Sequence, residues 1–322
     1  MTNDVKKSPD RTELLGFPIT RRRLTAAGAA AGLLGLAGRA SAAAAEPPEV
    51  YYSPVVSAEK LIEAYERVSA GLSGRIGIKI HGGEARVNLP LFRALQEHIP
   101  GSDFVECNWA SDFGGARRWT ASHIEEIRRQ GVDFAPVDVL DRDDRYETIP
   151  VEGGNELTEI EVPAALLHDY GGIVVLTNFK IPSFAGYTGV VKNIGIGLAS
   201  PDGKARVHGK GYERTEGFFS RLADATKGIR AAMGTKMVGM SIITGLKADP
   251  YGGVTPKGGD LGILASLDPV ACDQAACDLI WGLPPDAARK LTTREKIDSG
   301  YLQLEDLERC GAGSRAYRLV RI

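Results

Sequence analysis

Short apolar runs alternate with longer amphipathic segments along most of the chain. Residues 75–80 ("RIGIKI"), 103–107 ("DFVEC") and 172–177 ("GIVVLT") have the length and composition of buried strands. Further strands are predicted near 134–140, at 237–243 and at 261–265. Apolar residues at helical spacing predict helices over 57–72, 89–99, 120–130, 216–233 and 269–281, followed by a helical tail.

This alternation of strands and helices predicts an α/β fold with a mostly parallel sheet flanked by helices. Residues 145–162 have a different pattern, which predicts a small hairpin insertion with its turn at Gly153-Gly154. We expect residues 57–322 to form a single α/β domain. The Pro-containing residues 43–56 are predicted to be a linker, and a glycine-rich segment to which no helix or strand is assigned follows the 172–177 strand up to His208.

Residues 1–42 have the three parts of an export signal. A twin-arginine opening, "TRRRL", precedes a weakly apolar stretch of about thirteen residues and a small-residue cleavage site, Ala40-Ser41-Ala42. A membrane span needs roughly 20 apolar residues, so we expect no stable membrane insertion after cleavage. The protein is therefore predicted to use the twin-arginine export machinery and to work in the periplasm or outside the cell. An uncleaved signal that tethers the protein is the alternative.

The charge of the mature chain argues against nucleic acid as a partner. Residues 1–42 contain seven of the 39 Lys and Arg residues and three of the 41 Asp and Glu residues, which leaves a net charge of −6 after cleavage. No basic tail or arginine-rich face remains to bind a phosphate backbone.

Polar side chains follow the predicted strands at their carboxyl ends, where open parallel sheets bind ligands. His81 and Glu84 come after the first strand, Glu106 and Asn108 end the second, and Asn178 follows 172–177. His81 and Glu84 are suited to moving protons or holding a metal. Glu106 lies within an apolar run and needs a partner there, so a structural ion pair is the alternative role.

Lysines flank the glycine-rich segment and are predicted to bind an anion. They are Lys180, Lys192 and Lys204, with Asn193 beside the second. The stretch "KNIGIGLAS" does not fit a dinucleotide-binding loop, because it lies well past its strand and no acid-tipped strand follows. Close backbone packing, or backbone contact with another ligand, fits its glycines better.

Other charged and sulfur-containing positions have simpler interpretations. We expect Arg117-Arg118 to be a surface pair and Asp141–Asp144 a solvated turn. The four cysteines, at 107, 272, 277 and 310, are interpreted as buried structural thiols.

Several motifs together resemble the domain-of-unknown-function family 362, whose members are often labelled iron-sulfur centre proteins. The motifs are "IKIHGGE" (78–84), "ECN" (106–108) with "GGAR" (114–117), "FK" (179–180), G-x-x-KN-x-x-IG-x-AS-x-x-GK-x-x-x-H (189–208) and D-x-GILAS-x-DPVA-x-D-x-A-x-x-D (260–278). The resemblance covers nearly the whole mature chain. It implies no settled reaction.

Two departures from the family pattern bear on its iron-sulfur label. Between Ile243 and Asp260 the chain has no cysteine, and Ile181-Pro182 replaces the Gly-His that follows "FK" in many members. Four scattered cysteines without a C-x-x-C run are poor cluster ligands. We therefore do not expect an iron-sulfur cluster, and the sequence identifies no other cofactor or metal.

The function predicted from these features is an exported enzyme that acts on a small anionic ligand. Its site would combine proton-transfer residues His81, Glu84 and His208 with ligand-binding residues Glu106, Asn108, Asn178, Lys180, Lys192, Asn193, Lys204 and Asp268, with metal assistance as a variant. The alternative is an extracytoplasmic protein that binds a metal or small anion without turning it over. A structural or partner-binding role with a relic site is the third hypothesis.

Overall fold

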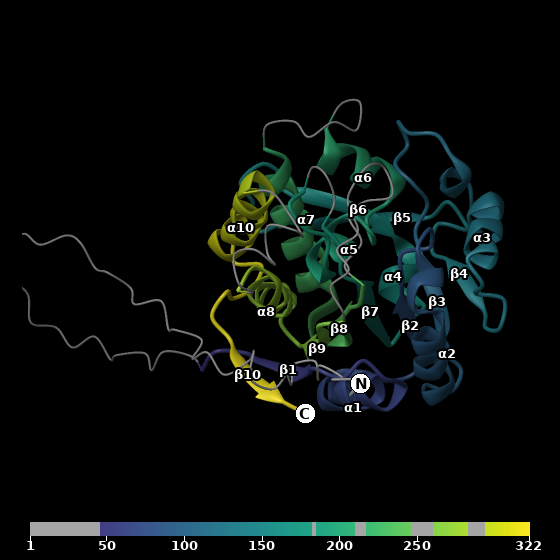
Figure 1. The fold of residues 1–322 in the computed structure, drawn as a ribbon. Helices are drawn as coiled ribbons and strands as arrows, with labels where there is room; N and C mark the ends of the chain where they lie inside the picture. The colour runs from purple at the N-terminus through teal and green to yellow at the C-terminus, as the bar shows by residue number, and fades with distance from the viewer. Residues whose placement is uncertain (1–45, 182–184, 210–216, 246–259, 283–293) are drawn as a thin grey trace, which may run out of the picture. The chain divides into compact units, whose positions relative to one another are not determined.

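The computed structural model describes residues 46–181, 185–209, 217–245, 260–282 and 294–322, which belong to one compact unit (Figure 1). An eight-stranded sheet lies at its centre, in the spatial order β10-β1-β9-β8-β7-β2-β3-β4. In chain order its strands are β1 (Glu49–Ser53), β2 (Ile76–Lys79), β3 (Asp103–Glu106), β4 (Val137–Val139), β7 (Gly172–Asn178), β8 (Met237–Ile243), β9 (Gly262–Ser266) and β10 (Arg318–Arg321). The predicted α/β class with a mostly parallel sheet is confirmed.

The order of the strands fixes where a ligand is expected to bind. From β2 the chain moves outward to β3 and β4, and it then returns to place β7 and β8 on the other side of β2. These five strands are parallel, and β9 pairs antiparallel with both β8 and β1. The direction in which successive strands are added to the sheet therefore reverses between β2 and β7. Open α/β sheets bind ligands outside the carboxyl ends of the strands at such a point.

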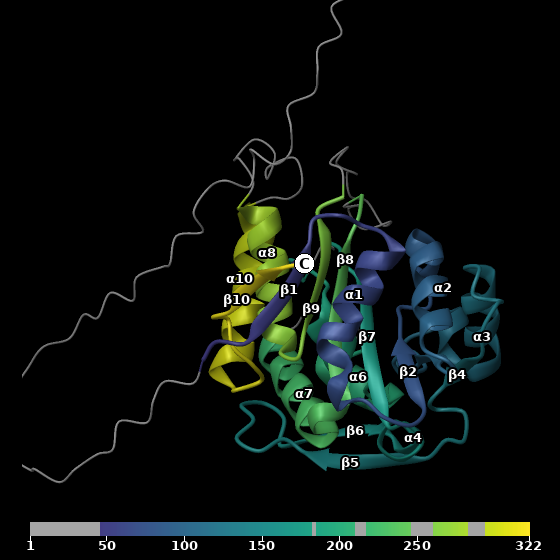
Figure 2. The same cartoon turned by 90° about the horizontal axis from the view of Figure 1, so that it is seen from below.

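Helices cover both faces of the sheet, and each face has its own apolar core (Figure 2). One layer contains α1 (Ala58–Val68), α2 (Leu89–His98) and α3 (Thr120–Arg129). The other contains α5 (Val190–Gly195), α7 (Phe218–Met233), α8 (Pro269–Trp281) and α10 (Arg294–Arg309), with the short α4 (Ala164–His168) and α6 (Pro201–His208) nearby. The 3-10 turns lie at Ser69–Gly71, Ala85–Asn88, Ala116–Arg118 and Gly234–Lys236.

The predicted hairpin insertion is present. Strands β5 (Tyr146–Pro150) and β6 (Glu159–Pro163) pair antiparallel, and Gly153 in the loop between them has a positive φ of 63°. Asp224 of α7 anchors this loop, because its buried carboxylate accepts the amide protons of Asn155, Glu156 and Leu157.

Three segments differ from the sequence-based expectation. The presumed linker contains β1, which is ordered by pairing with β9 on one side and β10 on the other. The helical tail likewise ends in a strand, β10. The glycine-rich segment forms α5 and α6, because its glycines permit close packing: a β-carbon at Gly195 would meet α7 at Leu222.

The predicted export signal lies outside the described residues. Within the described ranges, no helix is long and apolar enough to cross a membrane.

Candidate functional site

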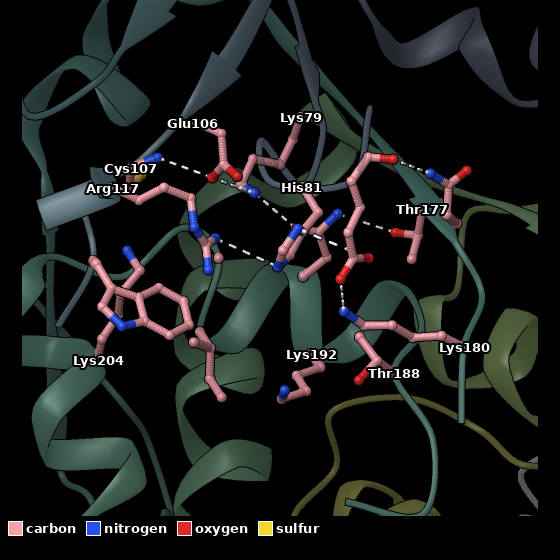
Figure 3. A pocket seen from close by; sticks show the side chains of 16 residues that line it. Lys79, His81, Glu106, Cys107, Arg117, Thr177, Lys180, Thr188, Lys192 and Lys204 are labelled. Carbon is pink, nitrogen blue, oxygen red and sulfur yellow. Dashed lines mark hydrogen bonds and ion pairs between the residues drawn. The ribbon is translucent and has the colours of Figure 1, made fainter. Parts of the chain in front are cut away.

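A cavity opens at the carboxyl ends of β2, β3 and β7, at the point where the strand order reverses (Figure 3). Its walls come from the loops that follow these strands and from α5 and α6. The lining residues are Lys79, His81, Glu84, Glu106, Cys107, Trp109, Arg117, Thr177, Asn178, Lys180, Thr188, Lys192, Asn193, Ile196, Gly197 and Lys204.

A buried ion pair forms one wall. Lys79 and Glu106 are the last residues of adjacent strands, and Lys79 Nζ lies 2.9 Å from Glu106 Oε2. Lys79 also donates to Asn193 Oδ1 at 2.7 Å, while Glu106 accepts the backbone amides of Gly82 and Cys107 at 2.6 and 3.2 Å. Burial alone would raise the pKa of Glu106. The nearby charges, that of Lys79 first, and the hydrogen bond from Lys79 lower this pKa to about 2. Glu106 is therefore a fixed carboxylate, held by its partners.

His81 stands in the middle of the site, with 29% of its side chain exposed. Its Nε2 lies 3.4 Å from an Arg117 guanidinium nitrogen, and its Nδ1 lies 3.9 Å from Glu84 Oε2. Burial, followed by the positive charges of Lys180 and Arg117, lowers the pKa of His81 well below its usual range. The imidazole is therefore neutral at physiological pH.

Glu84 connects the histidine to the opposite wall. One oxygen pairs with Lys180 Nζ, and the other faces His81. Asn178 at the end of β7 donates to the Glu84 carbonyl at 3.1 Å, and the Lys180 backbone is bonded in both directions to Thr188. The loop after β2 is thus tied to the segment after β7.

Helix α5 brings Lys192 and Asn193 to the cavity. The carboxylate of Asp273, on α8, accepts the amide protons of Val190 and Val191 at 2.8 and 3.0 Å and so caps the helix. Asn193 also donates to Thr177 Oγ1 at 3.1 Å, which fixes α5 against β7. Lys192 adds a further positive charge to the lining.

Arg117 and Lys204 line the side of the cavity nearest Trp109. The Arg117 guanidinium stacks over the Trp109 ring at 4.1 Å from its centroid, between the indole and His81. Lys204 on α6 is 2% exposed, and its amine donates to the carbonyl oxygen of Ala199.

The cavity suits a small anion. Its lining has five cationic side chains, Lys79, Arg117, Lys180, Lys192 and Lys204, against the carboxylates of Glu84 and Glu106. The cavity volume is about 60 Å³, which is room for about four to six waters at roughly 10–15 Å³ each. A small carboxylate or phosphate fits this space.

Eight of the residues predicted for the site line this cavity. They are His81, Glu84, Glu106, Asn178, Lys180, Lys192, Asn193 and Lys204.

Three predicted residues do not line it. The Asn108 side chain donates to Thr120 Oγ1 on α3. His208 ends α6 with its ring against Phe218, and burial lowers its pKa to about 3. Asp268 is the N-cap of α8, where it accepts the amide protons of Val270 and Ala271. Asn108 and Asp268 closely follow the ends of β3 and β9, and His208 ends α6, but each side chain makes a structural contact instead.

Eight lining residues were not predicted as site residues from the sequence, among them Ile196 and Gly197. Lys79 is hidden in the apolar run "RIGIKI"; the available signal was a second charge, Glu106, at the end of the next strand. Arg117, expected at the surface, reaches back to His81 because Gly115 takes a φ of 113° just before its 3-10 turn. Cys107, Trp109, Thr177 and Thr188 gave no separate sequence signal.

Residues 90–278 match the sequence family described as a domain of unknown function, DUF362. The match covers more than half of the chain. The protein belongs to the DUF362 family.

The four cysteines of this DUF362 protein lie within the described residues. All four are buried free thiols, and they lie on separate parts of the fold apart from Cys272 and Cys277 of α8. Burial raises the pKa of each thiol. Over the described ranges, no three His, Cys, Asp or Glu side chains gather in a group that could hold a metal ion.

Two solved structures are similar to parts of this chain. The lactate racemase apoprotein from Thermoanaerobacterium thermosaccharolyticum is 14% identical with a TM-score of 0.46, over 73% of this chain and 57% of that one. A protein from Thermotoga maritima is 10% identical with a TM-score of 0.40, over 79% of this chain and 59% of that one. The chain thus spans less than two thirds of the length of either protein. No curated protein matches its sequence significantly.

Proposed function

We propose that this DUF362 protein is an exported enzyme that binds a small anion in the cavity and transfers a proton to or from it through His81. The observation that carries the proposal is a neutral histidine set among an excess of cationic side chains at the strand-order reversal.

The charges explain why an anion would bind. Glu106 is paired with Lys79 and Glu84 with Lys180, so those two lysines are largely neutralised within the wall. Arg117 and Lys192 face the same space with positive charge, and an anion between them would gain charge-assisted hydrogen bonds.

The hydrogen bonds explain why His81 would act as a base. Arg117 can only donate, so its contact with Nε2 requires that nitrogen to be unprotonated. The ring proton then sits on Nδ1, which points toward Glu84. A ligand that draws Arg117 away frees the Nε2 lone pair to accept a proton, and the Glu84 carboxylate stabilises the imidazolium that forms.

Binding without catalysis is the second candidate function. It is favoured by the pairing of Glu84 with Lys180, which draws negative charge away from His81.

A proton-exchange experiment distinguishes the two functions. Purified protein is incubated in D2O with acetate, pyruvate, malonate or glycolate, and deuterium entry next to the carboxylate is followed by NMR. The enzyme proposal predicts accelerated exchange for at least one acid.

Variants make this test specific. His81→Ala should abolish the exchange but retain binding of the acid, while His168→Ala, at an exposed histidine far from the cavity lining, should leave both unchanged. Binding of an acid with no accelerated exchange would support the non-catalytic function instead.

A further inference from the structure

We propose that Lys204 forms a covalent imine with the carbonyl carbon of the bound anion, so that the ligand class is a small 2-oxo acid such as pyruvate or glyoxylate. This inference rests on the proposed small-anion function and adds a covalent step to it.

The contacts of Lys204 differ from those of Lys79, the other buried lysine of the cavity, and from those of Lys180. Lys79 pairs with Glu106 and Lys180 pairs with Glu84. The Lys204 amine donates only to the Ala199 carbonyl, and no carboxylate of the described residues lies within ion-pairing distance of it. A lysine buried in this way without a direct ion pair among the described residues is unusual for a purely structural side chain.

The surroundings of Lys204 favour the unprotonated amine that imine formation requires. Burial lowers the pKa of Lys204, and the positive charge of Lys79 acts in the same direction. Cys107 and Asp141 oppose the shift without reversing it. Reactive lysines in other enzymes are activated by the same two influences, loss of solvent and a neighbouring cation.

The rest of the cavity suits the other end of a 2-oxo acid. Arg117 and Lys192 line the same cavity as Lys204 and supply positive charge for the carboxylate. The small cavity volume admits a ligand of pyruvate size. His81 lines the same space and is a neutral base.

The chemistry balances without an added oxidant or reductant. The Nζ lone pair attacks the carbonyl carbon, and the carbonyl oxygen takes up the amine proton to give a carbinolamine. The hydroxyl then leaves as water with one proton from solvent, and the C=N bond of a protonated imine forms. When the ligand is pyruvate, His81 next removes a proton from the methyl carbon beside the imine; that electron pair forms a C=C bond while the C=N pair returns to nitrogen. Glyoxylate has no proton at that position and can form the imine only. The imine therefore acts as the electron sink for the proton transfer proposed above.

Reductive trapping tests the imine. The full chain is incubated at neutral pH with pyruvate or glyoxylate and sodium cyanoborohydride, and the modified lysine is located by peptide mass spectrometry. We expect one ligand per chain on Lys204, saturable in pyruvate and suppressed by excess acetate, which competes for the carboxylate site but has no carbonyl. Exposed lysines should react more slowly by at least tenfold.

Two variants and a binding measurement separate the outcomes. Lys204→Arg keeps a long basic side chain but removes the nucleophilic amine and should lose the label, and Lys236→Met, at an exposed lysine, should keep it. If calorimetry shows that pyruvate binds while Lys204 stays unmodified, or if the label spreads over exposed lysines, the imine is wrong and the small-anion function stands. If neither pyruvate, glyoxylate nor acetate binds, the function and the imine both fail.

Discussion

Gly189 and Asp273 lie in direct contact, so that a β-carbon on residue 189 would overlap the Asp273 carboxylate. That carboxylate accepts the first two amide protons of α5, the helix that carries Lys192 and Asn193. The glycine that begins one family motif and the aspartate within another are therefore one structural unit. It positions two side chains of the cavity without lining it.

Gly189→Ala is expected to destabilise the fold by about 1–3 kcal/mol, the usual cost of forcing extra atoms into a packed interior. Asp273 is fixed by its hydrogen bonds and cannot move away without losing them. Chemical denaturation of both proteins measures the difference. Gly114→Ala is the matched control, because a β-carbon there meets nothing within 4 Å, and it should change stability little. Equal effects of the two substitutions would show that the contact does not matter.

His123 is expected to make stability depend on pH. It is 1% exposed, neither ring nitrogen forms a hydrogen bond within the described part of the chain, and burial lowers its pKa to about 4. The unfolded chain, with a pKa near 6.5, takes up a proton at higher pH than the folded one. Stability is therefore lost as pH falls from about 6.5 to about 4, by roughly 2–4 kcal/mol from this residue.

The comparison of His123→Gln with the unmodified protein isolates this effect. Asp141, whose pKa burial raises to about 6, acts in the opposite direction over part of the same range, but it is present in both proteins. Denaturation at pH 7, 5.5 and 4 should show a smaller loss of stability in the variant. Parallel pH profiles for the two proteins would contradict the assignment.

Breaking the buried Lys79–Glu106 pair is expected to cost far more than breaking a surface pair. Lys79→Met leaves Glu106 charged and without its partner, for a predicted loss of about 3–5 kcal/mol. Lys60→Met removes the solvent-exposed pair with Glu63 and should have little effect. Thermal and chemical denaturation of the two variants measure the contrast. A Lys79→Met protein as stable as Lys60→Met would show that the pair is not structurally important.

The predicted export signal can be tested through the location of the protein. Changing Arg21 and Arg22 together to lysine should leave the precursor in the cytoplasm, because the twin-arginine machinery reads this pair as an address. Fractionation of cells followed by immunoblotting measures the distribution. Arg11→Lys, outside the motif, is the control and should be exported normally. Normal export of the double variant would rule out this route.

The strand ends were predictable because periodicity and the parallel arrangement follow from local sequence. His81, Glu84, Glu106 and Asn178 were found in that way. Strand β1 was missed because its order comes from pairing with β9 and β10, which are distant in sequence. Arg117 was missed because a backbone turn at Gly115 decides where its side chain points. The hydrophobic periodicity of the sequence identifies which strand ends meet at one edge of the sheet. The direction in which each side chain points depends on packing between distant residues.

The claim that this cavity is a small-anion site is tested most directly by calorimetric titration of the protein with acetate, pyruvate, oxalate and phosphate. The account predicts that at least one of them binds, that affinity falls as salt increases, and that Arg117→Met and Lys192→Met each weaken binding at least tenfold while Lys236→Met does not. Failure of all four anions to bind, or equal affinity in all three variants, would contradict it.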